Sequence, residues 1–301
     1  MKTIILAAIF AMPVSAQVCI DQAKVVAPVL SDAARKTHTE NLDIALANYK
    51  AKPGANSVIW LARRQGYLGQ YKEAIATLSA GIQRWPDDPR FLRHRGHRYI
   101  TLRCFEDAIK DLQKASDMTF SKPDEVEPDG IPNARNIPTS TLNTNIWYHL
   151  GLAHYMKGDF SRAAAGFMQA FNRATNPDMK VAAAHWVYMS ARRYGEKTSP
   201  AVLLRQEIKD GLDVIENVDY YKLIKLYKGR LKSADLELEI QGDANTLGSA
   251  SLAYGIGNYF LYNGDRIKAS DIFRQIVSGN QWASFGYIAA EAELARQKHD
   301  R

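Results

Sequence analysis

Cysteine is scarce in this 301-residue chain, which contains only Cys19 and Cys104. Two cysteines without Cys-x-x-Cys spacing exclude a structural zinc finger. The chain also lacks a Gly-x-Ser-x-Gly elbow, a phosphate-binding loop and a His-Glu-x-x-His motif. Gly255-Ile-Gly257 begins like a dinucleotide loop, but the third glycine is missing. We therefore expect no catalytic residue, no bound metal and no cofactor.

Blocks of one charge sign are absent as well. The formal net charge of +7 is spread along the chain, and hydrophobic residues make up 46% of it. A nucleic-acid-binding protein concentrates its basic residues on one face or in one stretch, and a disordered protein is less apolar. The composition therefore indicates a folded protein with a solvated surface and no nucleic-acid partner.

Long apolar runs are missing beyond the first residues. The stretch from Ile4 to Met12 is apolar but too short to span a bilayer, and it follows the basic Lys2. Val14-Ser15-Ala16 then supplies a small-x-small cleavage site, which is typical of a secretory leader. We expect residues 1–16 to be a signal peptide, the mature protein to be periplasmic or secreted, and no transmembrane segment to follow.

The two cysteines bear on the same question of export. A bacterial lipoprotein is cleaved just before a cysteine, but Val18 stands where a Gly or Ala is wanted before Cys19, so we expect no lipid anchor. An oxidising compartment would permit a Cys19–Cys104 disulfide. The spacing alone is equally compatible with two unpaired thiols.

Proline is sparse except in one stretch, and glycine and alanine recur in register. A ten-residue pattern appears four times, with Ala74 and Ala108 of the first two copies 34 residues apart. A period of this length is typical of a helix–turn–helix unit. The copies read Gly69-Gln-Tyr-Lys-Glu-Ala-Ile-x-x-Leu78, Arg103-Cys-Phe-Glu-Asp-Ala-Ile-x-x-Leu112, Gly158-Asp-Phe-Ser-Arg-Ala-Ala-x-x-Phe167 and Gly264-Asp-Arg-Ile-Lys-Ala-Ser-x-x-Phe273.

Each of the last three copies follows a predicted helix with a small residue on its packing face, namely Gly96, Gly151 and Gly257. These units resemble tetratricopeptide repeats, and the third, which runs from Trp147 to Ala170, matches the family pattern at nearly every position. The first is looser, with Gly81 where Ala is usual. The resemblance implies an all-α, right-handed solenoid that binds a protein or a peptide in its concave groove.

One segment of the chain lies outside the repeat period. The stretch between Gly96 and Gly151 is longer than one period by the length of a loop, and this extra segment is rich in proline and acidic residues. We expect it to be a solvated loop. Two degenerate units fit before the last repeat, about two helices lie between Cys19 and Tyr49, and a capping helix ends the array. The predicted organisation is N-terminal helices at 17–54, repeats 1 and 2 at 55–122, the proline-rich loop at 121–141, repeat 3 and a degenerate unit at 142–212, a second degenerate unit and the last repeat at 213–283, and the cap at 284–301.

A second resemblance covers the C-terminal part. The element Tyr220-Tyr-Lys-Leu-Ile-Lys-Leu-Tyr-Lys-Gly229, followed by the last repeat and Phe285-x-x-Ile-Ala-Ala-Glu-Ala-Glu-Leu294, is similar to periplasmic tetratricopeptide scaffolds of the new lipoprotein I type. This resemblance implies a role in cell-envelope complexes that bring peptidoglycan hydrolases together with a tail-specific protease.

Candidate binding residues lie on the predicted first helix of each unit. In tetratricopeptide arrays one face of that helix lines the concave groove, and aromatic and Arg side chains carry much of the binding energy at protein interfaces. An alternative is that these side chains only pack on the proline-rich loop. The predicted partner-binding residues are Arg63, Arg93, His97, Tyr148, Tyr155, Tyr254 and Asn258.

Three imidazoles could also converge, because His149 occupies the place of His94 one unit later. We interpret these histidines as polar groove residues rather than metal ligands. Two other functions stay open: a helical hydrolase acting on peptidoglycan or glycan, which would need paired carboxylates in the groove, and a self-assembling structural protein that forms a homodimer. The predicted groove rows contain no acid pair, which favours the adaptor.

Overall fold

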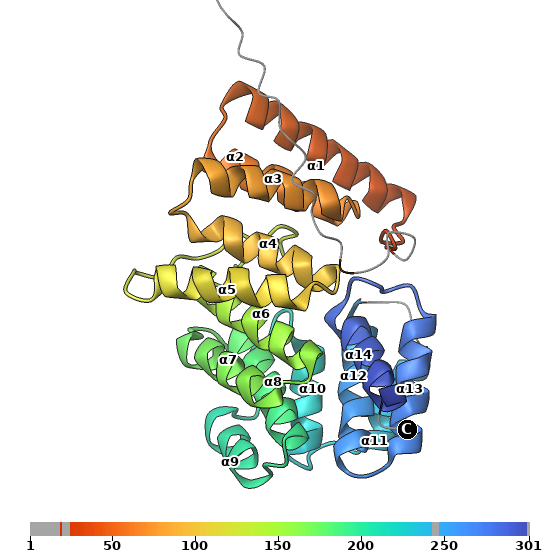
Figure 1. Cartoon of the computed structure of the whole chain (residues 1–301). Coiled ribbons are helices and arrows are strands. Elements are labelled where there is room, and N and C mark those ends of the chain that lie inside the picture. Colours follow the sequence, from red (N-terminus) through yellow and green to blue (C-terminus); the bar gives the residue numbers. More distant parts are fainter. Residues whose placement is uncertain (1–18, 20–24, 243–246, 300–301) are drawn as a thin grey trace, which may run out of the picture.

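The computed structural model describes Cys19, residues 25–242 and residues 247–299, and every regular element in these ranges is an α-helix (Figure 1). The predicted all-α class is confirmed. In chain order the helices are α1 (Asp32–Ala51), α2 (Ala55–Tyr67), α3 (Tyr71–Arg84), α4 (Pro89–Thr101), α5 (Phe105–Thr119), α6 (Leu142–Lys157), α7 (Phe160–Arg173), α8 (Pro177–Arg193), α9 (Thr198–Glu207), α10 (Val218–Tyr227), α11 (Ser233–Gly242), α12 (Leu247–Tyr262), α13 (Arg266–Ser278) and α14 (Phe285–His299).

The four copies of the repeat motif form the helix pairs α2–α3, α4–α5, α6–α7 and α12–α13. In three of these pairs a glycine on the first helix faces the last motif residue on the second. A Cβ at Gly96, Gly151 or Gly257 would lie 2.7, 2.9 or 2.6 Å from Leu112, Phe167 or Phe273, respectively. Such distances are too short for real Cβ contacts, so glycine is what lets the two helices meet. These pairs are helix–turn–helix units that pack through a glycine, as the motifs predict.

Gly81, which departs from the repeat pattern, also has a packing reason. A Cβ there would lie 2.2 Å from the Phe91 ring, and Phe91 is fully buried against Trp85, whose ring centroid is 5.6 Å away. The alanine usual at this position would collide with that ring. The first unit therefore differs from the others because a large aromatic side chain fills the space between α3 and α4.

Local signals explain where the motif helices begin. The Asp159 and Asp265 side chains accept hydrogen bonds from backbone N–H groups in the first turns of α7 and α13. Gly158 and Gly264 precede them at φ of 86° and 99°, a backbone region that glycine reaches without steric cost. At the matching turn between α4 and α5 stands Arg103, which takes a φ of 60°.

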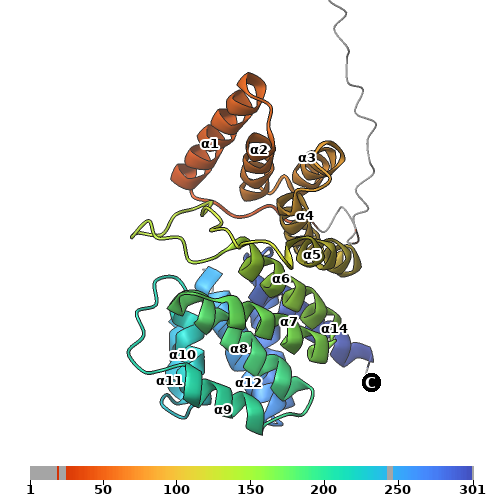
Figure 2. The ribbon, with the colours of Figure 1, turned by 90° about the vertical axis from the view of Figure 1, so that its left-hand side faces the viewer.

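The proline-rich segment at 121–141 contains no helix and passes between the N-terminal helices and the rest of the array (Figure 2). Asp124 fixes its exit, because the carboxylate accepts from the Asn143 backbone N–H at 3.0 Å at the start of α6. The expectation of a solvated acidic loop is wrong at Glu127, whose side chain is buried. That residue points toward basic side chains of α4 instead of toward water.

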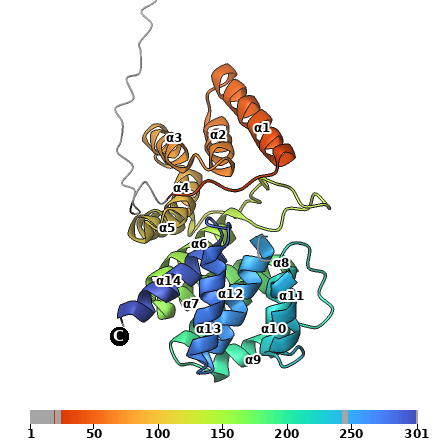
Figure 3. The same cartoon turned by 90° about the vertical axis from the view of Figure 1, so that its right-hand side faces the viewer.

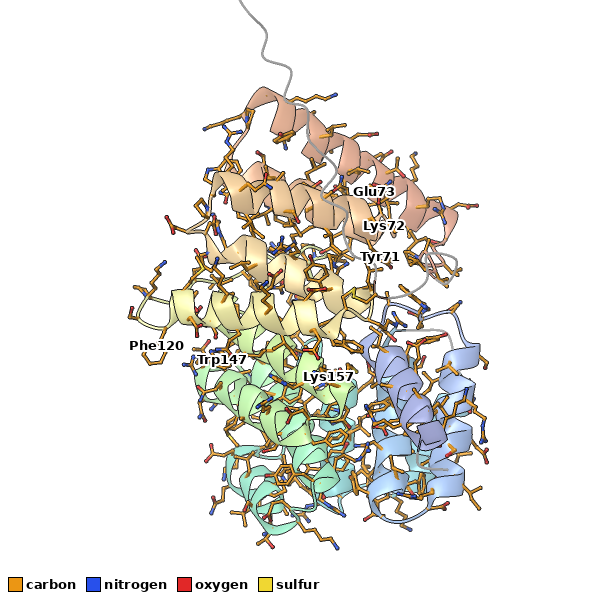
Figure 4. The ribbon with its side chains drawn as sticks, viewed as in Figure 1. Tyr71, Lys72, Glu73, Phe120, Trp147 and Lys157 are labelled. Atoms are coloured by element: carbon orange, nitrogen blue, oxygen red, sulfur yellow. A yellow bond between two sulfur atoms is a disulfide. The ribbon has the colours of Figure 1, made fainter. Side chains whose placement is uncertain are left out.

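The array curls until its C-terminal helices contact earlier ones. Helix α12 lies against α8, and α14 lies against α6 (Figure 3). The connection between α13 and α14 reaches the N-terminal repeats, where the Trp282 ring stacks on Tyr71 at 6.0 Å between centroids. Tyr71 marks the start of α3 (Figure 4). Helix α14 is therefore enclosed on several sides, with Ala289 and Ala290 fully buried.

The N-terminal part and the stretch before the last repeat contain the helices that lie outside the four motif pairs. Between Cys19 and Tyr49 the described residues contain one helix, α1, rather than the two expected. The pairs α8–α9 and α10–α11 occupy the stretch in which the sequence allows two degenerate units. None of the helices that the structure describes has the length and apolar character needed to cross a membrane. The predicted leader lies outside the described residues.

Candidate binding cleft

A cleft of about 470 Å³ opens where α6, α8 and α10 meet the start of α14 and the proline-rich segment. The cleft is lined by the rings of Tyr148, His149 and Phe285, which we call its aromatic side, and by polar side chains from other segments, which we call its polar rim. His97 of α4 belongs to the lining as well. The cleft thus combines residues from the second and third repeats with residues far along the chain.

The aromatic side is built from rings in mutual contact. The centroids of the His97 and His149 rings are 4.5 Å apart, and each ring lies within 5.6 Å of the Phe285 centroid. Tyr148 is 7% exposed and packs edge-on against Phe167. The prediction that His97 and Tyr148 line a concave surface is consistent with their position, and their role in binding stays a prediction.

The tautomer of His149 follows from its hydrogen bond. Its Nδ1 lies 2.6 Å from the backbone oxygen of Asn145, and a carbonyl can only accept, so Nδ1 carries the proton. Burial, with Arg93 nearby, holds the pKa of His149 well below its usual range. The ring is therefore neutral at pH 7, and its Nε2 keeps a lone pair that can accept a hydrogen bond.

The polar rim carries carboxylates that the groove prediction did not contain. Asp129 comes from the proline-rich segment, and Glu216 and Asp219 come from the start of α10 and the connection before it. The Asp178 carboxylate positions that connection, because it accepts from the backbone N–H of Glu216 at 2.7 Å. Burial, together with the nearby Glu216, raises the pKa of Asp129. The helix rows read from the sequence contain no acid pair, and the cleft gains its carboxylates from the proline-rich segment and from α10 with the connection before it.

A smaller cavity of about 120 Å³ lies next to the cleft, between α2 and α4, and shares His97 with it. Besides His97, two further predicted binding residues line this cavity, Arg63 and Arg93. Arg63 donates from Nη1 to the Pro128 oxygen at 2.8 Å, and the Arg93 Nε lies 2.8 Å from a Glu127 oxygen. Both side chains therefore pack on the proline-rich segment, which is the alternative that the sequence left open.

The remaining three predicted residues do not line a groove. Tyr155, Tyr254 and Asn258 are at most 1% exposed, because the faces of α6 and α12 that carry them meet each other and α14. The two tyrosine hydroxyls are 2.8 Å apart, and the Tyr254 hydroxyl is 3.3 Å from the buried Glu293 carboxylate. Arg193 pairs with that carboxylate and donates to Asn258. These residues form a buried polar network that fixes α14, so their placement on an accessible surface was wrong.

Potential metal ligands gather elsewhere. Within the described ranges, the donor atoms that come within 4.8 Å of one another belong to Cys19, Cys104 and Asp107. The two sulfurs are bonded to each other in a disulfide, which decides between the two states that the spacing left open. A disulfide sulfur is not a thiolate and is a poor metal ligand. The group therefore holds the N-terminal segment to the start of α5.

Among the lining residues that sequence reasoning missed are Phe285, Glu127 and Arg98. Phe285 is 136 positions after His149, so no helical spacing connects the two. Glu127 was seen only as one acid of a loop. Arg98 is five positions after Arg93 and so falls outside the i, i+4 row used to find groove residues. The basic composition of α4 was the one available signal.

Comparison with known proteins gives one kind of match. No family model matches the chain, and no curated protein matches it either. Among solved structures, it is similar to YrrB, a tetratricopeptide repeat protein described as having an unusual peptide-binding site. The identity is 14%, the match covers 84% of this chain and 96% of that one, and the TM-score is 0.40. At these values we take neither a site nor a function from that likeness.

Proposed function

We propose that this protein is an exported tetratricopeptide-type adaptor that holds a segment of a partner protein in the 470 Å³ cleft. The observation that carries the proposal is the aromatic side of the cleft, where Tyr148, His149 and Phe285 meet beside a polar rim. Rigid aromatic side chains contribute large contact areas at a small entropic cost, and they are enriched among the residues that dominate binding energy. The neutral His149 and the rim carboxylates can bond the backbone N–H groups of an extended segment.

Two observations support export. The sequence begins with the features of a secretory leader, and the Cys19–Cys104 disulfide is of a kind that persists in oxidising compartments and is rare in the cytosol. We propose a periplasmic or secreted location on this basis. The resemblance of the C-terminal part to scaffolds of the new lipoprotein I type favours a partner in the cell envelope.

The test compares a variant in the cleft with a variant outside it. Phe285→Ala removes a half-buried ring from the cleft, whereas Trp147→Ala changes the neighbour of Tyr148 that faces Arg173 on the outer side of α6. Trp147 lies there near the exposed Phe120, away from the cleft (Figure 4). We expect Phe285→Ala to weaken retention of the partner from the native exported fraction by roughly 5- to 30-fold, as the loss of one aromatic anchor does.

Retention by Trp147→Ala should equal that of the wild type, and melting curves of both variants would show that each is folded. If Phe285→Ala holds the partner at full strength, binding lies outside the cleft. If the retained protein is a second copy of this chain, the adaptor proposal gives way to the self-assembling homodimer, which size-exclusion chromatography with light scattering would show.

The rim carboxylates favour a second candidate function, the hydrolysis of a glycan. A carboxyl with a raised pKa beside another carboxylate is the arrangement that general acid catalysis in glycan hydrolysis uses, and Asp129 near Glu216 has it. Glu216, however, already accepts from the Thr139 hydroxyl at 2.9 Å and from Asn133, which gives it a structural role. Release of soluble fragments from purified peptidoglycan by the wild type, but not by Asp129→Asn, would establish the hydrolase.

A further inference from the structure

The cavity between α2 and α4 has an excess of positive charge. Its lining includes the guanidinium groups of Arg63, Arg93 and Arg98, and Glu127 is the one carboxylate among its described lining residues. His94 and His97 line it as well, and burial holds the pKa of both rings well below the usual range, so they add no charge at pH 7. Three cations against one anion leave the cavity with an unbalanced charge.

The imbalance is concentrated at Arg98. Arg93 has Glu127 at 2.8 Å and Arg63 has the Pro128 oxygen, but within the described parts of the chain the Arg98 guanidinium makes no ion pair and no hydrogen bond. Its carbon lies 5.9 Å from the centroid of the Tyr71 ring. The Arg98 side chain is half-buried, and its guanidinium offers five donors. An occupant with negative charge would supply acceptors for these donors and balance the charge of the cavity.

A glycine on the facing helix makes room for this side chain. A Cβ at Gly66 of α2 would lie 2.8 Å from the Arg98 Nη1, so any larger residue would displace the guanidinium. Gly66 is buried in the last turn of α2, and the absence of a side chain there leaves the space that the Arg98 guanidinium uses.

The size of the cavity limits what it can hold. About 120 Å³ corresponds to a few water molecules at roughly 30 Å³ each. A single phosphate or one carboxylate group fits this space, and a nucleotide or a sugar does not. His97 lines both this cavity and the cleft, so a group in the cavity can belong to a ligand that continues into the cleft.

We propose that this cavity binds one oxyanion group, a phosphate or a carboxylate, between Arg98 and Arg93, and that Glu127 occupies part of the same site from the proline-rich segment. The group comes either from a free inorganic anion or from an acidic side chain of the segment held in the cleft. The second source rests on the function proposed above, whereas the oxyanion site itself does not. Planar, forked guanidinium groups bind both kinds of oxyanion with two parallel hydrogen bonds.

The first experiment uses the purified protein with inorganic phosphate, measured by thermal shift and by calorimetry, against sodium chloride of equal ionic strength. We expect phosphate to raise the melting temperature beyond the salt control, because a ligand that binds only the folded state stabilises it. Arg98→Met should lose at least tenfold in phosphate affinity. Arg205→Met, on the exposed side of α9, removes the same charge elsewhere and should bind phosphate as the wild type does.

The stability of Arg98→Met without added anion keeps this test interpretable. If the guanidinium is unpaired in the empty cavity, removing it should leave the melting temperature unchanged or raise it. A folded Arg98→Met with unchanged phosphate binding would overturn the proposal. So would a wild-type protein that phosphate stabilises no more than sodium chloride does.

The second experiment separates the two sources and tests the part assigned to Glu127. Glu127→Gln removes the competing carboxylate and should bind phosphate more tightly than the wild type. A tetraglutamate peptide that competes with phosphate identifies an acidic side chain as the natural occupant, and a peptide that does not compete identifies a free anion. Because neither assay contains the partner, failure here is distinct from loss of retention by Phe285→Ala. Unchanged phosphate affinity of Glu127→Gln would refute the overlap between Glu127 and the anion.

Discussion

Arg103 occupies a turn position where three other repeats have glycine. Replacing Arg103 tests what the arginine contributes to the stability of the fold. Its backbone has a φ of 60°, and Gly69, Gly158 and Gly264 hold the matching turns with positive φ. The Arg103 guanidinium stacks 3.9 Å from the Trp282 ring centroid, donates from Nη2 to the Trp282 oxygen at 3.0 Å and pairs with Glu291 at 2.7 Å. The strained turn thus holds the α13–α14 connection onto the N-terminal repeats.

Two variants separate the strain from the contacts. Arg103→Ala loses the contacts and keeps the left-handed backbone, whereas Arg103→Gly loses the contacts and relieves the backbone. A charge-assisted hydrogen bond contributes about 1.5–3 kcal/mol, and a partly desolvated cation–π contact contributes about 0.5–2 kcal/mol. We therefore expect Arg103→Ala to lower the free energy of unfolding by about 2–5 kcal/mol. The left-handed backbone costs roughly 1–2 kcal/mol for a residue other than glycine, so Arg103→Gly should lose about 1 kcal/mol less.

Urea denaturation followed by circular dichroism would give the three free energies. Hydrogen exchange of residues 279–291 would show whether the connection is released, since amides that lose tertiary contacts open more often. Equal free energies for Arg103→Ala and Arg103→Gly would show that the turn is not strained. Wild-type stability in both variants would show that the Trp282 contacts do not hold the array closed.

Three further predictions test the disulfide, a buried histidine and a helix contact. Reducing Cys19–Cys104 removes a link across 85 residues and should lower the free energy of unfolding by up to roughly 4–5 kcal/mol. Dithiothreitol should therefore lower the melting temperature, and a double Cys→Ser variant should show the same lower melting temperature without dithiothreitol. Burial lowers the pKa of His185 to about 3 from 6.5, so the unfolded chain binds the proton first as pH falls. The free energy of unfolding should therefore drop by about 2 kcal/mol between pH 7 and pH 5. If a His185→Phe variant shows the same pH dependence of the free energy of unfolding, His185 is not its cause. Gly151→Leu forces a side chain onto Phe167 and should lower the free energy of unfolding by about 1–3 kcal/mol or more, whereas an unchanged melting curve would mean that α6 and α7 can separate freely.

The repeat units were readable in the sequence because their causes are local. Gly96, Gly151 and Gly257 recur at a fixed distance from the large side chain that each contacts, and the period is set by two helices and two turns. The capping residues Asp159 and Asp265 act within one helical turn of their own position. Short-range geometry of this kind leaves a pattern that a reader of one sequence can detect.

The candidate site could be predicted only in part, because its exposure depends on contacts between residues far apart in the sequence. The helix face of each groove residue followed from spacing, but whether that face stays open depends on how far the array curls. Tyr155 and Tyr254 fall on the expected faces and are buried because α14 returns to cover them, held by Glu293, which is 138 positions after Tyr155. No local period encodes such a contact.

The all-α class, the helix pairs and the glycine contacts between them could be read from the residue order, because each depends on residues less than one repeat apart. Which of the predicted groove residues face a cavity depends on long-range packing. The curl of the array brings Phe285 beside His149 and buries Tyr155, and the proline-rich segment places Glu127 against Arg93. These placements depend on the sum of small rotations between successive helices and on one loop, and neither leaves a repeating trace in the order of the residues.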